Sequence, residues 1–266
     1  TTGVGTARQD LTASGYGGDK AIFGFGFSSS NTNITNLVSN TGVVATDTTG
    51  VGTARYGLAA SGYGSTGQAI FGFGGTGSLS NTTNLVSNTG VVASDTTGVG
   101  TARYNLAASG YGGDKALFGF GFFGSSPYRT NVTNLVSNTG VVASDSTGVG
   151  TARERLAAAG YGGDKAIFGF GSPSYDTYTN ITNLVSNTGV VASDSTGVGT
   201  ARQYLAAAGF GGDKAIFGFG GVESSSQLNA YNITNLVSNT GVVASDTTGV
   251  GTARAGLAAA GYSTTA

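Results

Sequence analysis

Short apolar segments recur along the whole chain, each bounded by glycine, asparagine or aspartate. Four of them, named here A to D, make one unit. A is Leu-Ala-Ala-(Ser/Ala)-Gly-Tyr, as at 58–63, and B is Ala-(Ile/Leu)-Phe-Gly-Phe-Gly. C is Asn-Ile-Thr-Asn-Leu-Val-Ser, as at 180–186, and D is Gly-Val-Val-Ala-Ser-Asp, as at 140–145. All are too short for stable helices, and their β-branched and aromatic residues predict strands.

The segments repeat in register. Segments B, C and D each occur five times, whereas Thr-Gly-Val-Gly-Thr-Ala-Arg occurs six times at intervals of 47 to 52 residues. It ends at Arg8, Arg55, Arg103, Arg153, Arg202 and Arg254. The sequence therefore predicts a single repeat domain over 1–266, with five units of about 49 residues and a surplus C-terminal half-unit from about 247.

Turn residues separate the predicted strands. Gly-Gly-Asp-Lys, as at 17–20, joins A to B, and Asn-Thr-Gly, as at 40–42, joins C to D. Four antiparallel strands in a unit of this length predict an all-β fold, a β-propeller of five four-stranded blades. An open β-solenoid is the alternative, but the unequal intervals and the hairpin turns argue against it.

Segments A and B predict how the units pack. Segment A is rich in alanine, serine and glycine, which suits the crowded axis of a ring. In segment B, Phe23 and Phe25 alternate with Gly24 and Gly26. We therefore expect an aromatic face on one unit to pack against a glycine face on the next.

Composition narrows the function. Charged residues make up 9% of the chain and the net charge is −1, so it lacks the positive field that binds nucleic acid. No apolar run is long enough to span a bilayer, and we expect no membrane insertion. Cysteine and histidine are absent, so the common metal sites and histidine-based catalysis are excluded. We expect no cofactor and no enzymatic activity.

The run Thr-Ala-Arg-x-x-Leu-Ala-Ala-Ala-Gly-Tyr-Gly-Gly-Asp-Lys-Ala-Ile-Phe-Gly-Phe-Gly resembles a kelch repeat. That resemblance covers all five units and implies a β-propeller. The sequence departs from the kelch pattern in having Gly-Phe-Gly for the glycine pair and in lacking the later Tyr and Trp. The repeats are also similar to arrays in virion structural proteins of marine bacteriophages, which implies a virion or extracellular location.

The sixth A segment has no place in a five-bladed ring. Both 11–16 and 257–262 fit the strand that closes such a ring. The other copy could extend freely, or it could pair with another molecule as a swapped strand. The swapped strand would make a homo-oligomer or join a neighbouring structural protein. A fragment of a longer array has the same pattern, and the sequence does not rank these alternatives.

Variation among the units is confined to the two residues after each repeated Arg and to the B-to-C loop. Antiparallel strand order places both on one face, which is typical of a binding surface on a rigid scaffold. Drift in unconstrained loops is the alternative. The candidate ligand-binding residues are Tyr56, Tyr104, Phe123, Tyr128, Arg129, Arg155, Tyr175, Tyr178, Tyr204, Glu223 and Tyr231.

For the repeated Arg we expect a structural role, paired with the repeated Asp of segment D or with backbone carbonyls. Each C segment also begins with Asn-x-Thr, as at Asn33. This matches the glycan acceptor pattern, but we expect cross-strand hydrogen bonding to explain it.

Together these patterns predict a non-catalytic binding or structural module whose partner is a glycan or a protein surface. Tyrosine and arginine are frequent anchors of such surfaces. The alternatives are an architectural spacer without a ligand and a sialidase-like enzyme. The latter would use Arg153, Glu154 and Tyr204, but the acidic turn boxes of sialidases are missing.

Overall fold

The computed structural model describes residues 4–224 and 227–262, and within them it contains strands but no helix. The all-β prediction is confirmed. Segment A forms β1 (Thr12–Tyr16), β4 (Ala59–Tyr63), β7 (Ala107–Tyr111), β10 (Ala157–Tyr161) and β13 (Ala206–Phe210). Segment B forms β2 (Lys20–Gly24), β5 (Gln68–Gly72), β8 (Lys115–Gly119), β11 (Lys165–Gly169) and β14 (Lys214–Gly218). Segment C forms β3 (Thr35–Val38), β6 (Thr83–Val86), β9 (Thr133–Val136), β12 (Thr182–Val185) and β17 (Thr234–Val237).

Each unit is a three-stranded antiparallel sheet in the order A, B, C. In the fourth unit, Ala159 on β10 pairs with Ile167 on β11, which pairs with Leu184 on β12. The B-to-C loop of the fifth unit adds a separate hairpin, β15 (Gly221–Ser224) with β16 (Gln227–Ala230).

Segment D differs from the prediction of a fourth strand. It makes only isolated bridges to segment C, such as Val185 with Val191 and Thr182 with Ser195. Between these two bridges the side-chain amide of Asn183 donates a hydrogen bond to the Ala192 carbonyl at 3.0 Å. This carbonyl of segment D is therefore bonded to a side chain of segment C as well as lying beside its backbone.

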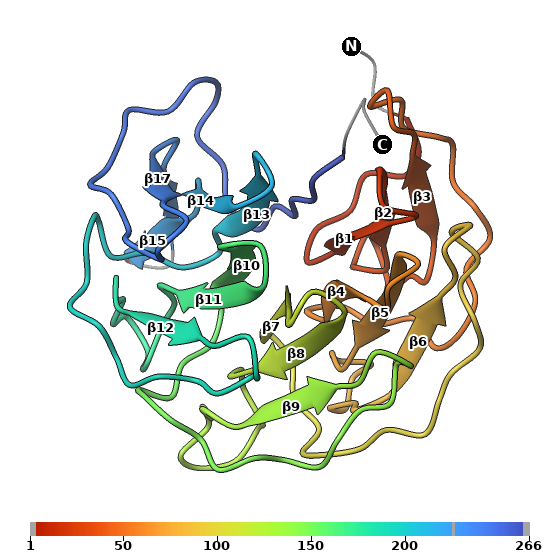
Figure 1. Ribbon diagram of the computed structural model, residues 1–266, viewed down its shortest axis with the longest axis horizontal. Helices are drawn as coiled ribbons and strands as arrows, with labels where there is room; N and C mark the ends of the chain where they lie inside the picture. The colour runs from red at the N-terminus through yellow and green to blue at the C-terminus, as the bar shows by residue number, and fades with distance from the viewer. Residues whose placement is uncertain (1–3, 225–226, 263–266) are drawn as a thin grey trace.

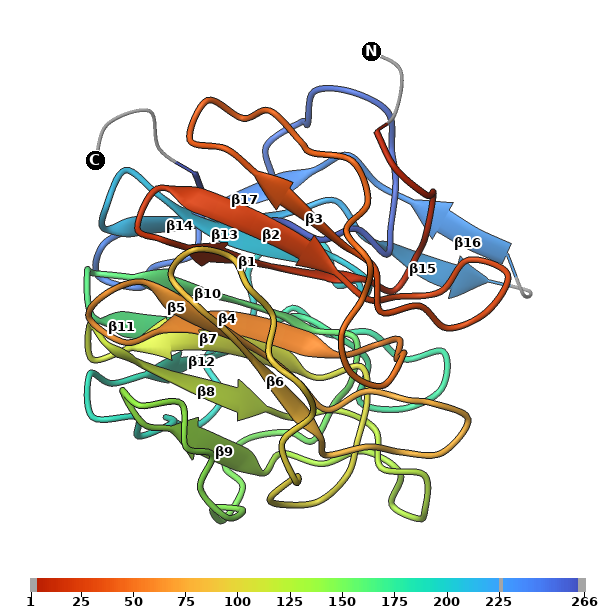
Figure 2. The ribbon, with the colours of Figure 1, turned by 90° about the vertical axis from the view of Figure 1, so that its right-hand side faces the viewer.

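The five sheets stand radially around one axis, with segment A innermost and segment C outermost (Figures 1 and 2). The inner strands of successive units lie side by side at these glycines, since a Cβ on Gly62 would lie 3.5 Å from the carbonyl oxygen of Gly15 in the preceding unit, an ordinary van der Waals contact. The same relation holds at Gly110, Gly160 and Gly209.

The structure differs from a ring closed by five units. Figure 1 shows an opening between β13 and β1. The sixth A segment lies there, since Gly261 is beside the Gly209 carbonyl and the Gly261 carbonyl is beside Gly15. Six inner segments therefore surround the axis, whereas five have complete sheets outside them.

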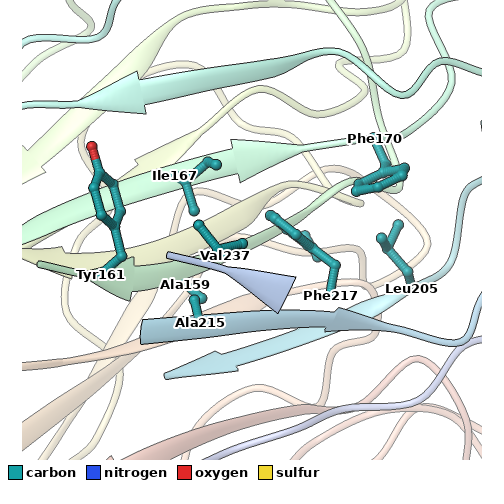
Figure 3. Packing of buried hydrophobic residues seen from close by; sticks show 9 residues of the cluster. Ala159, Tyr161, Ile167, Phe170, Leu205, Ala215, Phe217 and Val237 are labelled. Carbon is teal, nitrogen blue, oxygen red and sulfur yellow. The ribbon is translucent and has the colours of Figure 1, made fainter. Parts of the chain in front are cut away.

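Neighbouring units share a repeated apolar interface, which Figure 3 shows between the fourth and fifth units. The Phe217 ring of β14 lies 5.2 Å from the Phe170 ring and covers Gly169, where a Cβ would meet the ring at 2.8 Å. Phe217 is fully buried, as are Phe71, Phe118 and Phe168 at the same position. Burial of one such ring stabilises the fold by about 1.5–3 kcal/mol.

The second phenylalanine of segment B does not continue the strand as the alternation predicts. It adopts a positive φ, from 63° to 66°, in all five units, at Phe25, Phe73, Phe120, Phe170 and Phe219. A left-handed conformation costs an L-residue about 1–2 kcal/mol. It is compensated by packing, since the Phe170 ring lies beneath the Arg202 guanidinium at 4.3 Å as well as against Phe217.

Candidate functional site

The two variable regions meet at one end of the axis, named here the loop face. The first residue after each of the first five repeated arginines forms a bridge with the start of the B-to-C loop, as Tyr104 does with Phe122 and Glu154 with Ser172. Residues about 18 positions apart in the sequence are therefore neighbours. These bridges bring the two variable regions together in each of the five units.

Aromatic side chains form a row along the loop face. The Phe27 ring lies 6.5 Å from Tyr56, and Tyr56 lies 5.8 Å from Tyr104 in the next unit. Tyr104 lies 5.2 Å from Phe122, against which Tyr128 stacks at 5.9 Å. We call these five residues the aromatic row. Tyr128 is 48% exposed and the other four are half-buried, so the row presents rings to solvent.

A charged network adjoins the aromatic row. Arg129 lies over Phe122 and forms an ion pair with Glu154 at 2.8 Å. Arg155 contacts Glu154 and Glu223, each at 3.7 Å. The Arg155 guanidinium also lies 4.6 Å from the centre of the Tyr204 ring. We call Arg129, Glu154, Arg155, Tyr204 and Glu223 the charged network.

The remaining candidate ligand-binding residues lie outside both the aromatic row and the charged network. Tyr178 donates a hydrogen bond to the Glu223 carbonyl at 2.9 Å and accepts one from the Glu223 amide. It therefore holds the backbone of one member of the charged network. Tyr175 is 75% exposed at a loop tip, outside the row. The backbones of Phe123 and Tyr231 close their own loops, through hydrogen bonds to Tyr128 and Gly220.

The candidate ligand-binding residues did not include Phe27, Phe122 or Glu154, and Glu154 was named only for the sialidase-like alternative. Glu154 is almost fully buried between Arg129 and Arg155, which makes it the centre of the charged network. Its sequence position, directly after a repeated Arg, marked it as variable. The contacts with Arg129 and with Asn105 come from other segments and are visible only in the fold.

The inner segments begin at the centre of the loop face with a chain of backbone hydrogen bonds. It runs through Asp10, Gly57, Asn105, Arg155, Tyr204 and Gly256, and the amide of each of the last five donates to the carbonyl of the residue named before it, at 2.7–3.1 Å. All six residues have positive φ, from 50° to 70°. They line the mouth of a cavity of about 150 Å³ on the axis. Burial raises the pKa of Asp10, with Arg155 acting against it, and burial also raises the pKa of Tyr204.

A wider hollow of about 800 Å³ lies at the opposite end of the axis. Its rim carries Lys20, Lys115, Lys165 and Lys214. Each ammonium group is paired with the preceding aspartate, at 2.5–2.9 Å. These charges are therefore balanced within the A-to-B turns.

Four of the six repeated arginines are fully buried and do not line the cavity: Arg55, Arg103, Arg153 and Arg202. Arg8 is half-buried and Arg254 is exposed. Arg153 is fully buried and donates to the Phe170 carbonyl at 2.8 Å, the Thr151 carbonyl at 3.0 Å and Asn183 Oδ1 at 2.6 Å. Its guanidinium also covers the Phe120 ring of the preceding unit at 4.3 Å. Burial lowers the pKa of Arg103, Arg153 and Arg202 to about 10, so each stays charged at neutral pH.

An aspartate of segment D completes each of these clusters. Asp194 accepts hydrogen bonds from the Thr151 amide at 3.0 Å and from Asn183 at 2.9 Å, and lies 4.0 Å from Arg153. The same contacts recur at Asp47, Asp95, Asp145 and Asp246. Burial tends to raise the pKa of Asp194, but the hydrogen bonds from Thr151 and Asn183 lower it below 3.8 overall.

We expect the protein to lose stability in acid through these carboxyls. A lowered pKa in the folded state stabilises the fold above the unfolded-state pKa, and this contribution is lost as the pH falls through the folded value. The free energy of unfolding should thus begin to fall as the pH approaches 3.8 and continue falling below it. Urea unfolding at a series of pH values from about 5 to about 2.5 measures this. A curve that is flat or rises toward low pH would contradict the assignment.

The Asn-x-Thr asparagines are engaged in hydrogen bonds. The Asn180 amide donates to the Gly199 carbonyl at 2.6 Å, and Asn33, Asn81, Asn131 and Asn232 make the equivalent bond to the D-to-A link. These side chains fasten the link to the sheet, which gives the motif a structural reason.

No protein-family model matches this sequence, and a search of curated proteins finds no match. In the part of the chain that the structure describes, no helix has the length and apolarity required to cross a membrane.

Proposed function

We propose that this chain is a non-catalytic recognition module of the β-propeller type that binds a glycan through its loop face. The observation that carries the proposal is the aromatic row, which runs across three units and continues into the charged network. Exposed aromatic faces stack on the apolar faces of sugar rings. Charged and amide groups beside them suit the hydroxyl groups of the same ligand.

Backbone strain at the centre of the loop face supports this proposal. The positions of positive φ are occupied by glycine at Gly57 and Gly256, which adopt that conformation without strain. Arg155 and Tyr204 occupy the same position in other units at φ of 55° and 57°. Retaining large side chains where glycine is easier is typical of functional surfaces.

The arrangement of the charges favours binding over catalysis. Glu154 and Glu223 both contact Arg155, so each carboxylate is already committed to an ion pair. The setting we propose is a virion appendage or another extracellular assembly, in keeping with the resemblance to phage arrays.

A glycan-array screen of the purified chain tests the proposal, with Tyr128→Ala as the binding-site variant. Tyr128 is 48% exposed, so the variant should fold normally. We expect it to weaken binding of the selected glycan by about tenfold or more, the loss of about 1.4 kcal/mol typical of an aromatic anchor.

Tyr175→Ala is the matched control, because this tyrosine lies in the equivalent loop of the next unit but outside the aromatic row. It should bind as the unchanged chain does. No binding to any glycan would overturn the proposal and favour an architectural unit. Equal losses in both variants would place the site elsewhere.

A further inference from the structure

The sixth A segment occupies the place of an inner strand in a sixth unit. Gly220 donates a backbone hydrogen bond to Arg254 at 3.0 Å, as Gly171 does to Arg202 at 2.9 Å. The Arg254 guanidinium covers Phe219 at 4.5 Å, as Arg202 covers Phe170.

The other side of this segment meets the first unit in the same manner. Tyr262 lies against Gly42, just as Tyr16 lies against Gly90 and Tyr161 against Gly241. The inner part of a sixth position is therefore formed on both sides.

The outer part of this position is open, and the fifth unit exposes there the residues that other units bury. Phe210 is 42% exposed, whereas Tyr161 at the same position is buried in the interface that Figure 3 shows. Ile216 and Phe219 are half-buried, whereas their counterparts Ile167 and Phe170 are fully buried.

Two further differences show that an aromatic ring fits the exposed face. A Cβ on Gly169 would meet the Phe217 ring of the next unit at 2.8 Å, whereas one on Gly218 would meet only the Thr234 methyl at 3.5 Å. Gly218 is thus an open counterpart of the slot that holds Phe217. On the opposite wall, Phe23 of the first unit is half-buried, although its four counterparts are fully buried.

The polar contacts of the sixth position are also half-formed. Arg202 is held by Asn235 at 2.8 Å and by Asp246 at 3.9 Å, which follow it in segments C and D of its own unit. Arg254 is exposed, and among the described residues its guanidinium has only the Phe219 ring as a partner. The matching partners for Arg254 are an asparagine and an aspartate with the same spacing.

We propose that the opening outside 256–262 is a docking site for one further B-to-D segment of this repeat. The occupant is a polypeptide with Ala-(Ile/Leu)-Phe-Gly-Phe-Gly, Thr-Asn-Leu-Val and Ser-Asp in that order. Its first phenylalanine enters the slot at Gly218 and its glycines receive Phe23. Its asparagine and aspartate hold Arg254. The four complete interfaces within the chain are the template for both of its sides.

An extended chain tests this inference, with a copy of residues 162–196 joined directly after Tyr262. We expect a higher melting temperature and a hydrogen-exchange protection at Ile216 and Leu236 that increases by about tenfold or more. Leu236 is 46% exposed without the extension, so it reports directly on covering of the face. The matched control extension carries Phe168→Ser in the appended copy and should leave protection unchanged.

Arg254→Ala provides an independent readout. It should lower the melting temperature of the extended chain clearly, and that of the unextended chain little, because only the appended segment supplies Asn and Asp. Equal effects of Arg254→Ala in both chains, or no added protection at Ile216, would overturn the proposal. The alternative occupant is a second copy of the chain, and light scattering of the unextended chain tests for it. A dimer in which Ile216 is already protected would show that the second copy fills the opening.

Discussion

Replacing Arg153 with alanine is expected to lower the free energy of unfolding by about 3–5 kcal/mol, the range for removing one partner of a buried charged cluster. The side chain is fully buried, and its loss leaves the Phe170 carbonyl and Asn183 Oδ1 without their donor. It also removes the cation from the face of Phe120, which couples the fourth unit to the third. Urea unfolding followed by circular dichroism measures the change.

Arg254→Ala is the matched control, since the chain carries the same residue in the same motif. Its guanidinium is exposed and contacts only the Phe219 ring among the described residues, so we expect a cost of about 0.5–1 kcal/mol. Arg153→Lys separates charge from geometry. Lysine keeps the charge but lacks the planar guanidinium that reaches three acceptors. The free energy of unfolding of Arg153→Lys should therefore remain well below that of the unchanged chain. Similar effects of Arg153→Ala and Arg254→Ala would contradict the structural role of the buried cluster.

The repeat explains why much of the fold could be predicted from the sequence. Alternating apolar residues and glycine turns are local signals, and segments A, B and C form strands close to where those signals place them. Segment D carries an equally apolar Val-Val pair, yet forms only isolated bridges. There the Ala192 carbonyl accepts a hydrogen bond from the side chain of Asn183, nine residues earlier, and no local sequence pattern predicts that contact.

The face that carries the candidate site could be predicted from the sequence, but the residues that meet there could not. Antiparallel order places the variable regions on one face, and the structure brings them together there. Which side chains join depends on the next unit along: Tyr56 meets Tyr104, and Arg155 meets Glu223. Tyr175 lies in the equivalent loop of the next unit and has the same chemistry as Tyr128, but among the described residues no ring stacks on it as Phe122 does on Tyr128. Residue type alone does not distinguish the two.

The sixth A segment shows a similar limit. Counting motifs gave six copies of A and five of B, C and D, which predicted one surplus copy but left open which terminal copy closes the ring and where the other lies. The spacing of the inner strands around the axis decides this. Gly261 meets Gly209 and Gly15 as the glycines of other successive units meet, so all six copies lie around the axis.

Phe118→Ala is expected to lower the free energy of unfolding by about 3–5 kcal/mol, as for other buried phenylalanines in well-packed cores. Phe118 has no exposed surface and packs against Phe73 of the preceding unit at 5.1 Å. It also fills the slot over Gly72, where a Cβ would lie 2.6 Å from the ring. Removing the ring therefore leaves a cavity between two units that rigid sheets cannot close. Equilibrium urea unfolding measures the loss.

Phe23→Ala is the matched control, because Phe23 occupies the same position in the first unit but has no complete unit before it and is half-buried. Its smaller burial should reduce the loss to about half or less of that for Phe118→Ala. The reciprocal pair tests the glycine side of the same contact. Gly72→Ala should cost about 1–3 kcal/mol through overpacking against Phe118, whereas Gly218→Ala meets only the Thr234 methyl and should be nearly neutral. If the two phenylalanines, or the two glycines, gave equal losses, packing between successive units would not be the main source of stability.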